Sequence, residues 1–140
     1  MSDGEHLVSC LCGAIGLSAA GAPLWVGLCH CRSCRRATGG VLMAAAGFPR
    51  QAVSIERGQM SYYASSPGVR RGFCGTCGTS LSYENARWPG DIHLMIGAFE
   101  RPDALQPQFH IFAEDRLPWL KLADGLPQYR TTPSDGRLME

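Results

Sequence analysis

The chain has 140 residues, a length typical of one domain, with 45% hydrophobic and 18% charged residues, ordinary values for a soluble globular protein. Its formal net charge of +1 excludes a strong electrostatic attraction to nucleic acid or to an anionic membrane. No run approaches the roughly 18 consecutive apolar residues of a transmembrane helix. The opening MSDGEHLVSC lacks the basic and apolar regions of a secretory signal. We therefore expect a cytoplasmic protein without nucleic-acid or membrane partners.

Short β-like runs alternate with glycine and proline turn signals along the chain. The runs that we expect to be strands span residues 14–19, 23–31, 41–49, 52–58, 59–66, 69–74, 79–85, 91–99 and 109–115. The segment RSCRRATG at 32–39 predicts a helix of about two turns that Gly39 closes. Strands at this spacing predict a mainly antiparallel β domain. We expect one domain over residues 1–130 and a polar, flexible tail over 131–140.

The seven cysteines are the most informative residues of the sequence. Seven is an odd number, so complete disulfide pairing is excluded, and thiols in a reducing compartment are better candidates for metal ligands than for disulfides. They fall into three groups, a C-x-C pair, a C-x-C-x-x-C triplet and a C-x-x-C pair: Cys10 and Cys12; Cys29, Cys31 and Cys34; Cys74 and Cys77. In the last group, Gly75 and Gly78 permit a tight turn whose N–H groups point at the sulfurs, as in zinc knuckles.

Spacing alone leaves two ways to divide these ligands between two metal ions. In the first, which we prefer because the triplet is compact, Cys10, Cys12, Cys74 and Cys77 form a closed site and Cys29, Cys31 and Cys34 an open one. In the second, two C-x-x-C pairs join as in a zinc ribbon, Cys31 with Cys34 and Cys74 with Cys77. Cys10, Cys12 and Cys29 are then left over. An open three-ligand site keeps one position for water or substrate, the pattern of catalytic zinc.

The motifs CLCGAI, CHCRSCRRATGG, FCGTCGTSL and PQFHIFAEDRLPWLKLADGLPQY, in this order over residues 10–129, resemble the glutathione-dependent formaldehyde-activating enzyme family, which includes the centromere protein V-like domain. The resemblance implies a β-tent-type fold pinned by zinc. It also implies the first division of the cysteines, with the four-cysteine set as the structural zinc site and the triplet as the catalytic one. The implied activity is that of a carbon–sulfur lyase that reversibly joins formaldehyde and glutathione.

Other candidate site residues lie near the triplet or in the later strands. Arg35 and Arg36 could bind the carboxylates of a glutathione-like substrate, because guanidinium groups bind carboxylates bidentately. His110 is our candidate proton donor, with His93 as the alternative, and either could also be the fourth ligand of the triplet. His30 points away from its two cysteine neighbours in an extended C-H-C turn, so we do not expect it to bind the same metal ion. We expect His6 at the surface.

Two other functions remain open at this point. The chain could be a zinc-stabilised binding module without catalysis, as the centromere-protein relatives imply. It lacks the basic extension that would favour nucleic-acid binding. It could also be a metal or redox sensor that uses Cys29, Cys31 and Cys34 as labile, oxidisable ligands.

Overall fold

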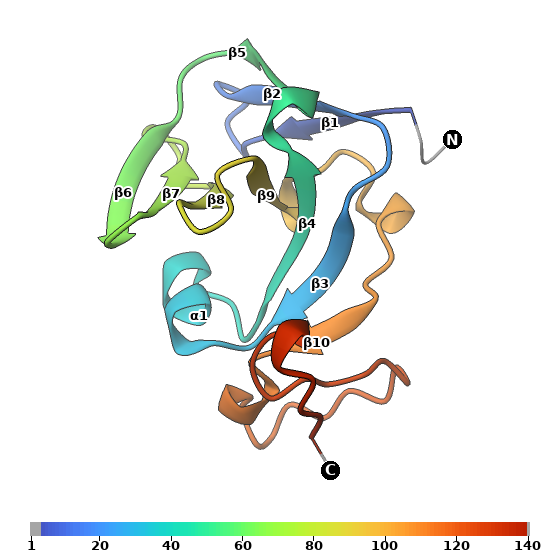
Figure 1. Cartoon of the computed structure of the whole chain (residues 1–140). Helices are drawn as coiled ribbons and strands as arrows, with labels where there is room; N and C mark the ends of the chain where they lie inside the picture. Colours follow the sequence, from blue (N-terminus) through green and yellow to red (C-terminus); the bar gives the residue numbers. More distant parts are fainter. Residues whose placement is uncertain (1–3, 140) are drawn as a thin grey trace. The chain divides into compact units, whose positions relative to one another are not determined.

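A computed structural model describes residues 4–139 of the chain, which form ten strands, one α-helix and five short 3₁₀ turns (Figure 1). The strands are β1 (Glu5–Ser9), β2 (Gly16–Ala20), β3 (Trp25–Cys29), β4 (Met43–Pro49), β5 (Val53–Arg57), β6 (Ser61–Ser66), β7 (Val69–Phe73), β8 (Ser80–Asn85), β9 (Asp91–Met95) and β10 (Phe109–Ile111). The helix α1 spans Arg32–Thr38. No helix among the described residues is long and apolar enough to cross a bilayer.

The chain divides into two compact units. The first comprises the residues up to Trp25 together with Ala46–Leu105, and the second comprises Val26–Ala45 and the residues from Gln106 onward. The strand β4 therefore contributes its residues 43–45 to the second unit and its remainder to the first.

The first unit is antiparallel. Strands β1, β2 and β5 form a small sheet in that order, and β9, β8, β7 and β6 follow one another in a meander (Figure 1). Its buried side chains include Val8, Leu17, Phe48, Leu81 and Leu94. These apolar residues come from β1, β2, β4, β8 and β9, whereas β5 and β6 have no buried residue.

The second unit is built around a parallel pair of strands. Strand β10 pairs with β3, in the register His110 with Leu28 and Ile111 with Cys29. Gly27 is needed here, because a Cβ at this position would lie 2.6 Å from a ring carbon of Phe109. Beyond β10 the chain returns alongside it, since the N–H of His110 donates to the Pro127 carbonyl (2.9 Å) and the His110 carbonyl accepts from Tyr129 (2.9 Å).

The predicted mainly β fold with one short helix is confirmed, and Gly39 ends α1 in the left-handed region at φ 74°. Three predictions about strands were wrong in detail. The expected strand at 91–99 ends at Met95 and continues as a 3₁₀ turn, and the one at 109–115 stops at Ile111 because Phe112 adopts a positive φ of 52°. Strand β1 was missed because its alternating pattern includes His6, which is buried and not at the surface. Whether residues 1–130 fold as a single domain and 131–140 as a flexible tail stays a prediction.

Candidate functional site

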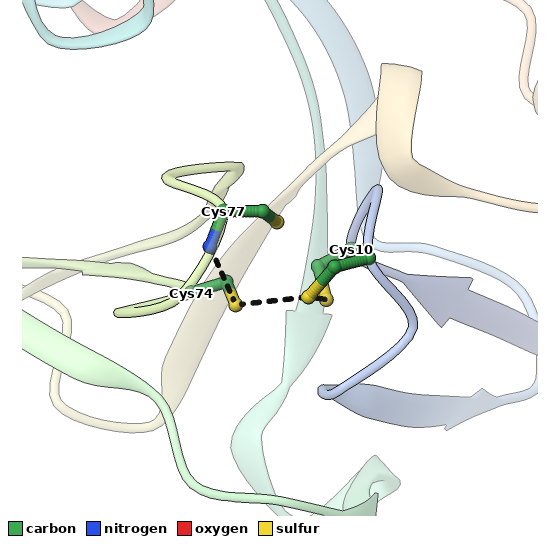
Figure 2. A group of neighbouring side chains, drawn as sticks. Cys10, Cys74 and Cys77 are labelled. Carbon is green, nitrogen blue, oxygen red and sulfur yellow. Dashed lines mark hydrogen bonds between the residues drawn. The ribbon is translucent and has the colours of Figure 1, made fainter.

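The four cysteines expected to form a closed set lie together in the first unit. Their sulfur atoms are all within 4.8 Å of one another, and none is in a disulfide; they are Cys10, Cys12, Cys74 and Cys77. Figure 2 shows the sulfurs of Cys10, Cys74 and Cys77 turned toward one another from two loops, one after β1 and one between β7 and β8.

The distances within this four-cysteine cluster suit a tetrahedral metal ion. The Cys12 sulfur lies 3.7 Å from that of Cys10 and 3.7 Å from that of Cys74. A Zn–S bond of about 2.3 Å places neighbouring sulfurs of a tetrahedral site about 3.8 Å apart. The cluster could therefore bind a metal ion without large movement of its loops.

Local backbone geometry turns these sulfurs inward. The N–H of Ile15 donates to the Cys10 sulfur (3.2 Å), and the N–H of Cys77 donates to the Cys74 sulfur (3.4 Å; Figure 2). Gly78 follows with φ 82°, a conformation that favours glycine and closes the knuckle. The Thr79 hydroxyl joins the two loops, since it accepts from the N–H of Leu11 (3.0 Å) and lies 3.2 Å from the Cys77 sulfur.

The pKa values of two thiols in the four-cysteine cluster, Cys77 and Cys12, are shifted in opposite directions. Hydrogen bonds from the hydroxyl and the N–H of Thr79 lower the pKa of Cys77 to about 5. A hydrogen bond from the Ala14 N–H acts in the same direction on Cys12, but burial and the neighbouring sulfurs outweigh it and raise the pKa of Cys12 to about 11. One thiolate thus forms easily and another resists ionisation beside it. A divalent cation would remove this conflict, because it stabilises all the thiolates at once.

The three-cysteine cluster lies in the second unit, where β3 leads into α1. The sulfurs of Cys29, Cys31 and Cys34 are also within 4.8 Å of one another. Cys29 ends β3, Cys31 is the N-cap of α1, and the Cys34 N–H donates to the Cys31 sulfur (3.3 Å). The adjacent sulfurs of Cys31 and Cys34, followed by burial, raise the pKa of Cys29. This donor set also suits a cation that would hold all three groups as thiolates.

Among the described residues, no fourth cysteine, histidine, aspartate or glutamate joins this triplet. His30, between two of its members, turns its ring to another histidine. Its Nε2 lies 2.8 Å from Nδ1 of His110, and Nε2 of His110 lies 2.8 Å from Oδ2 of Asp124. His30 and His110 are 1% and 0% exposed, whereas the Asp124 side chain is 33% exposed. Both ring nitrogens of the predicted proton donor His110 thus have partners.

The pKa values of His30 and Asp124 both lie below their ordinary values. Burial, together with the nearby His110, lowers the pKa of His30 to about 4, so its ring is neutral near pH 7. Partial desolvation would raise the pKa of Asp124, but hydrogen bonds from the Leu126 N–H and from His110 outweigh it and leave that pKa below its usual range. Asp124 is therefore a carboxylate near pH 7.

A cavity of about 770 Å³ lies beside the two histidines, entirely within the second unit. His30 and His110 line it, together with the polar side chains of Arg116, Lys121 and Gln128 and several leucines. Its volume is in the range of small-molecule sites.

The remaining predicted residues lie in different settings. Arg35 donates through Nη1 to the Asp115 carbonyl (2.9 Å), and Arg36 is exposed on α1. His93 lies in the first unit among the rings of Trp25, Tyr83 and Trp88, at centroid distances of 4.6, 5.3 and 6.1 Å.

Asp124 was not among the site residues predicted from the sequence. Its Oδ1 accepts from the N–H of Leu126 (3.0 Å), and Gly125 follows at φ 74°. The Asp-Gly pair is a turn signal, and this signal could have marked the position without revealing its partner.

Comparison with known proteins places these features in a family. The sequence matches the family described as glutathione-dependent formaldehyde-activating enzyme over residues 5–115. A Schizosaccharomyces pombe protein named as an uncharacterized lyase is 37% identical over 94 residues, which are 66% of this chain and 68% of that protein. A crystal structure of a Rhodobacter sphaeroides protein matches with a TM-score of 0.57 and 23% identity, over 67% of this chain and 87% of the other, a likeness of fold.

The matched region contains both cysteine clusters and covers most of the chain. The resemblance predicted from the cysteine motifs is therefore confirmed: the chain belongs to the glutathione-dependent formaldehyde-activating enzyme family.

Proposed function

We propose that this protein is a zinc-dependent carbon–sulfur lyase that acts on the adduct of glutathione, or of another thiol, with formaldehyde or another small aldehyde. The observation that carries the proposal is the contrast in ligand number between the two cysteine clusters. Four sulfurs complete a tetrahedral zinc site, whereas the triplet supplies three sulfurs and has no fourth protein ligand among residues 4–139. Family membership and the name of the yeast relative as a lyase support the reaction class.

The proposal assigns two zinc ions with different roles. The cluster of Cys10, Cys12, Cys74 and Cys77 would hold a structural ion, and the sulfurs of Cys29, Cys31 and Cys34 would hold a catalytic one. When bound at the triplet, zinc supplies the positive charge that favours the thiolate form of a substrate thiol. Because none of the seven cysteines is in a disulfide, we also infer that the protein works in a reducing compartment, the cytoplasm.

The overall chemistry is a reversible addition. In the forward direction the substrate S–H proton is lost, a sulfur–carbon bond forms, and the aldehyde oxygen takes up a proton as it becomes a hydroxyl. In reverse the hydroxyl proton is lost, the sulfur–carbon bond breaks, and the thiol regains its proton. A site for this reaction has to orient the thiol and exclude most water, and the burial of Cys29 and Cys34 is suited to that task.

Two arginines of the helix are proposed to bind the substrate's carboxylates. Arg36 is exposed on α1, two residues beyond Cys34. Arg35 is fixed by its hydrogen bond to the Asp115 carbonyl, which uses one of its five N–H donors. His110, which we predicted as proton donor, enters the proposal as a buried member of a hydrogen-bond chain, because both of its ring nitrogens have partners.

The test is exchange NMR of formaldehyde with glutathione, with and without catalytic amounts of the zinc-loaded protein. We expect the exchange rate to rise with protein concentration and to fall to the uncatalysed rate in Cys34→Ser. Circular dichroism of Cys34→Ser establishes that this variant keeps the fold, so that a lost rate enhancement reports on the triplet. An unchanged exchange rate with the two-zinc wild type would overturn the proposed substrates and favour a binding module.

A further inference from the structure

The buried chain from Asp124 through His110 to His30 has no assigned role in the proposed lyase. Its two hydrogen bonds, each 2.8 Å, join a loop, β10 and the turn after β3. Burying two imidazoles and hydrogen-bonding one of them to a carboxylate is costly compared with apolar packing. The geometry of these three side chains indicates which part of the backbone they hold in place.

The chemistry of the three groups assigns their hydrogens. An ionised Asp124 can only accept, so Nε2 of His110 carries the hydrogen that it donates to Oδ2. Nε2 of His30 then donates to Nδ1 of His110, because a hydrogen on the other nitrogen of His30 would be a buried N–H without a partner. This leaves Nδ1 of His30 without a hydrogen. That nitrogen is buried and has no hydrogen-bond partner.

The backbone at His30 and His110 is also fixed, and this backbone carries the triplet. The N–H of His30 donates to the Ile111 carbonyl (3.0 Å), directly after the register pair of Ile111 with Cys29. His110 is itself held on both sides, by β3 and by the returning segment at 127–129. Cys31 has an extended conformation (φ −64°, ψ 149°), so side chains alternate through the C-H-C turn. A rotation of the His30 peptide would therefore move the sulfurs on either side of it.

We infer that Asp124 and His110 are positioning residues of the triplet: they hold His30 in one tautomer and one orientation, and thereby hold the turn of Cys29 and Cys31 in its metal-binding geometry. This inference rests on the proposed metal site at the triplet. It extends that proposal to residues that contact neither metal nor substrate. In other metal sites, loss of a group that is hydrogen-bonded to a ligand weakens metal binding by about 10- to 100-fold, which sets the upper range for residues that act through His30.

The most informative variant is Asp124→Asn, which keeps the shape of the side chain and replaces one of its two acceptor oxygens by a donor amide. The remaining oxygen still accepts from the N–H of Leu126, so the amide faces His110. An asparagine that donates its amide N–H to Nε2 of His110 would force Nδ1 of His110 to donate to His30. Nε2 of His30 would then accept and Nδ1 would carry the hydrogen. The variant therefore reverses the tautomers of both rings without changing their packing. Asp124→Glu restores a carboxylate, and Asp124→Ala removes the partner without supplying a donor.

The experiment uses zinc-loaded full-length protein and two readouts. Imidazole ¹⁵N chemical shifts report which nitrogen of His30 carries the hydrogen. Zinc release to a chromogenic chelator in excess reports how firmly each ion is held, and Cys34→Ser identifies the phase that belongs to the triplet. Asp103→Asn, at an exposed aspartate of the first unit, is the matched control for loss of one negative charge.

We expect Asp124→Asn to invert the His30 tautomer and to speed release from the triplet about 10- to 100-fold, with the four-cysteine ion unaffected. Asp124→Ala should speed release similarly, and Asp124→Glu should restore at least part of the wild-type rate and tautomer. If the wild type holds two ions and Asp124→Asn and Asp124→Ala both release them at wild-type rates, the inference is overturned while the proposed metal sites stand. A wild type with no ion at the triplet overturns both. If the wild type holds two ions firmly but does not catalyse the exchange of formaldehyde with glutathione, only the proposed substrates are overturned.

Discussion

The two cysteine clusters use the same side chain in different structural settings. The four-cysteine cluster joins two loops of an antiparallel unit that lie more than sixty positions apart in sequence, Cys10–Cys12 and Cys74–Cys77. The triplet comes from one strand-to-helix turn of six residues. A ligand set drawn from distant segments ties the fold together, whereas a local set adds little to stability and can be left incomplete. Ligand separation along the chain, together with ligand number, is therefore the basis on which we propose a structural role for one cluster and a chemical role for the other.

The largest expected difference between the clusters is in stability. Cys77→Ser removes one ligand from the cluster that joins the distant loops, and structural zinc contributes on the order of 10 kcal/mol to such small domains. Because this is comparable to the whole stability of a domain, we expect the variant to be unfolded or to melt far below the wild type. Thermal unfolding by circular dichroism measures the effect.

Cys34→Ser is the matched control, since it also removes a single cysteine ligand. It should lose one zinc ion by metal analysis and keep its fold, with a melting temperature close to that of the wild type. If both variants unfold to the same extent, the triplet is structural and the contrast between the clusters is lost.

A smaller effect is expected next to the triplet. Arg36→Gln removes one guanidinium from the helix that carries Cys34, and a hydrogen bond to a charged group contributes about 1.5–3 kcal/mol. We expect KM for the glutathione adduct to rise about 10-fold, with kcat and zinc content unchanged, in steady-state kinetics of the lyase direction. Arg101→Gln, at an exposed arginine of the first unit, is the control. An equal change in both variants would mean that general charge, and not a carboxylate contact, is responsible.

A further effect, confined to one range of pH, is expected in the first unit, which carries no proposed chemistry. Burial among aromatic rings lowers the pKa of His93 to about 4, against an unfolded value of about 6.5. The unfolded chain therefore binds a proton first as the pH falls, and stability decreases between about pH 6.5 and pH 4, by at most about 3 kcal/mol. Urea unfolding at a series of pH values measures this slope.

His30 titrates over the same range, so the informative quantity is the difference between wild type and His93→Gln. The variant should lose the part of the slope that His93 contributes. Equal slopes in the two proteins would show that His93 is not held neutral by the fold.

Features of the fold and of the candidate site could be predicted from the sequence when their residues lie a few positions apart. The C-x-x-C knuckle with Gly78, and the helix closed by Gly39, are fixed by residues a few positions apart, and their patterns predicted them well. The division of the cysteines was open on spacing alone, because spacing does not state which loops meet. Only the folded chain, in which the β7–β8 turn lies at the loop after β1, places Cys74 near Cys12.

The buried histidine pair could not be predicted for the same reason. His30 and His110 meet because β10 pairs in parallel with β3, eighty positions earlier, and no periodic pattern reports the partner of a three-residue strand. Asp124 lies in a segment without regular structure, where only the Asp-Gly turn was visible. Residues whose importance depends on a distant partner therefore need the fold before they can be recognised.

The separation of the ligands in sequence also has a consequence for biosynthesis. A ribosome delivers the triplet and the pair Cys10–Cys12 well before it reaches Cys74, so five thiols are available to metal before the last two exist. Early in translation the triplet could bind a metal ion with a sulfur from the first pair, and this would give the wrong division. The folded chain brings Cys74 and Cys77 to Cys10 and Cys12, with the Thr79 hydroxyl joining the β7–β8 turn to the first loop. We therefore expect the proposed division of the cysteines to form only after the β7–β8 turn has been made.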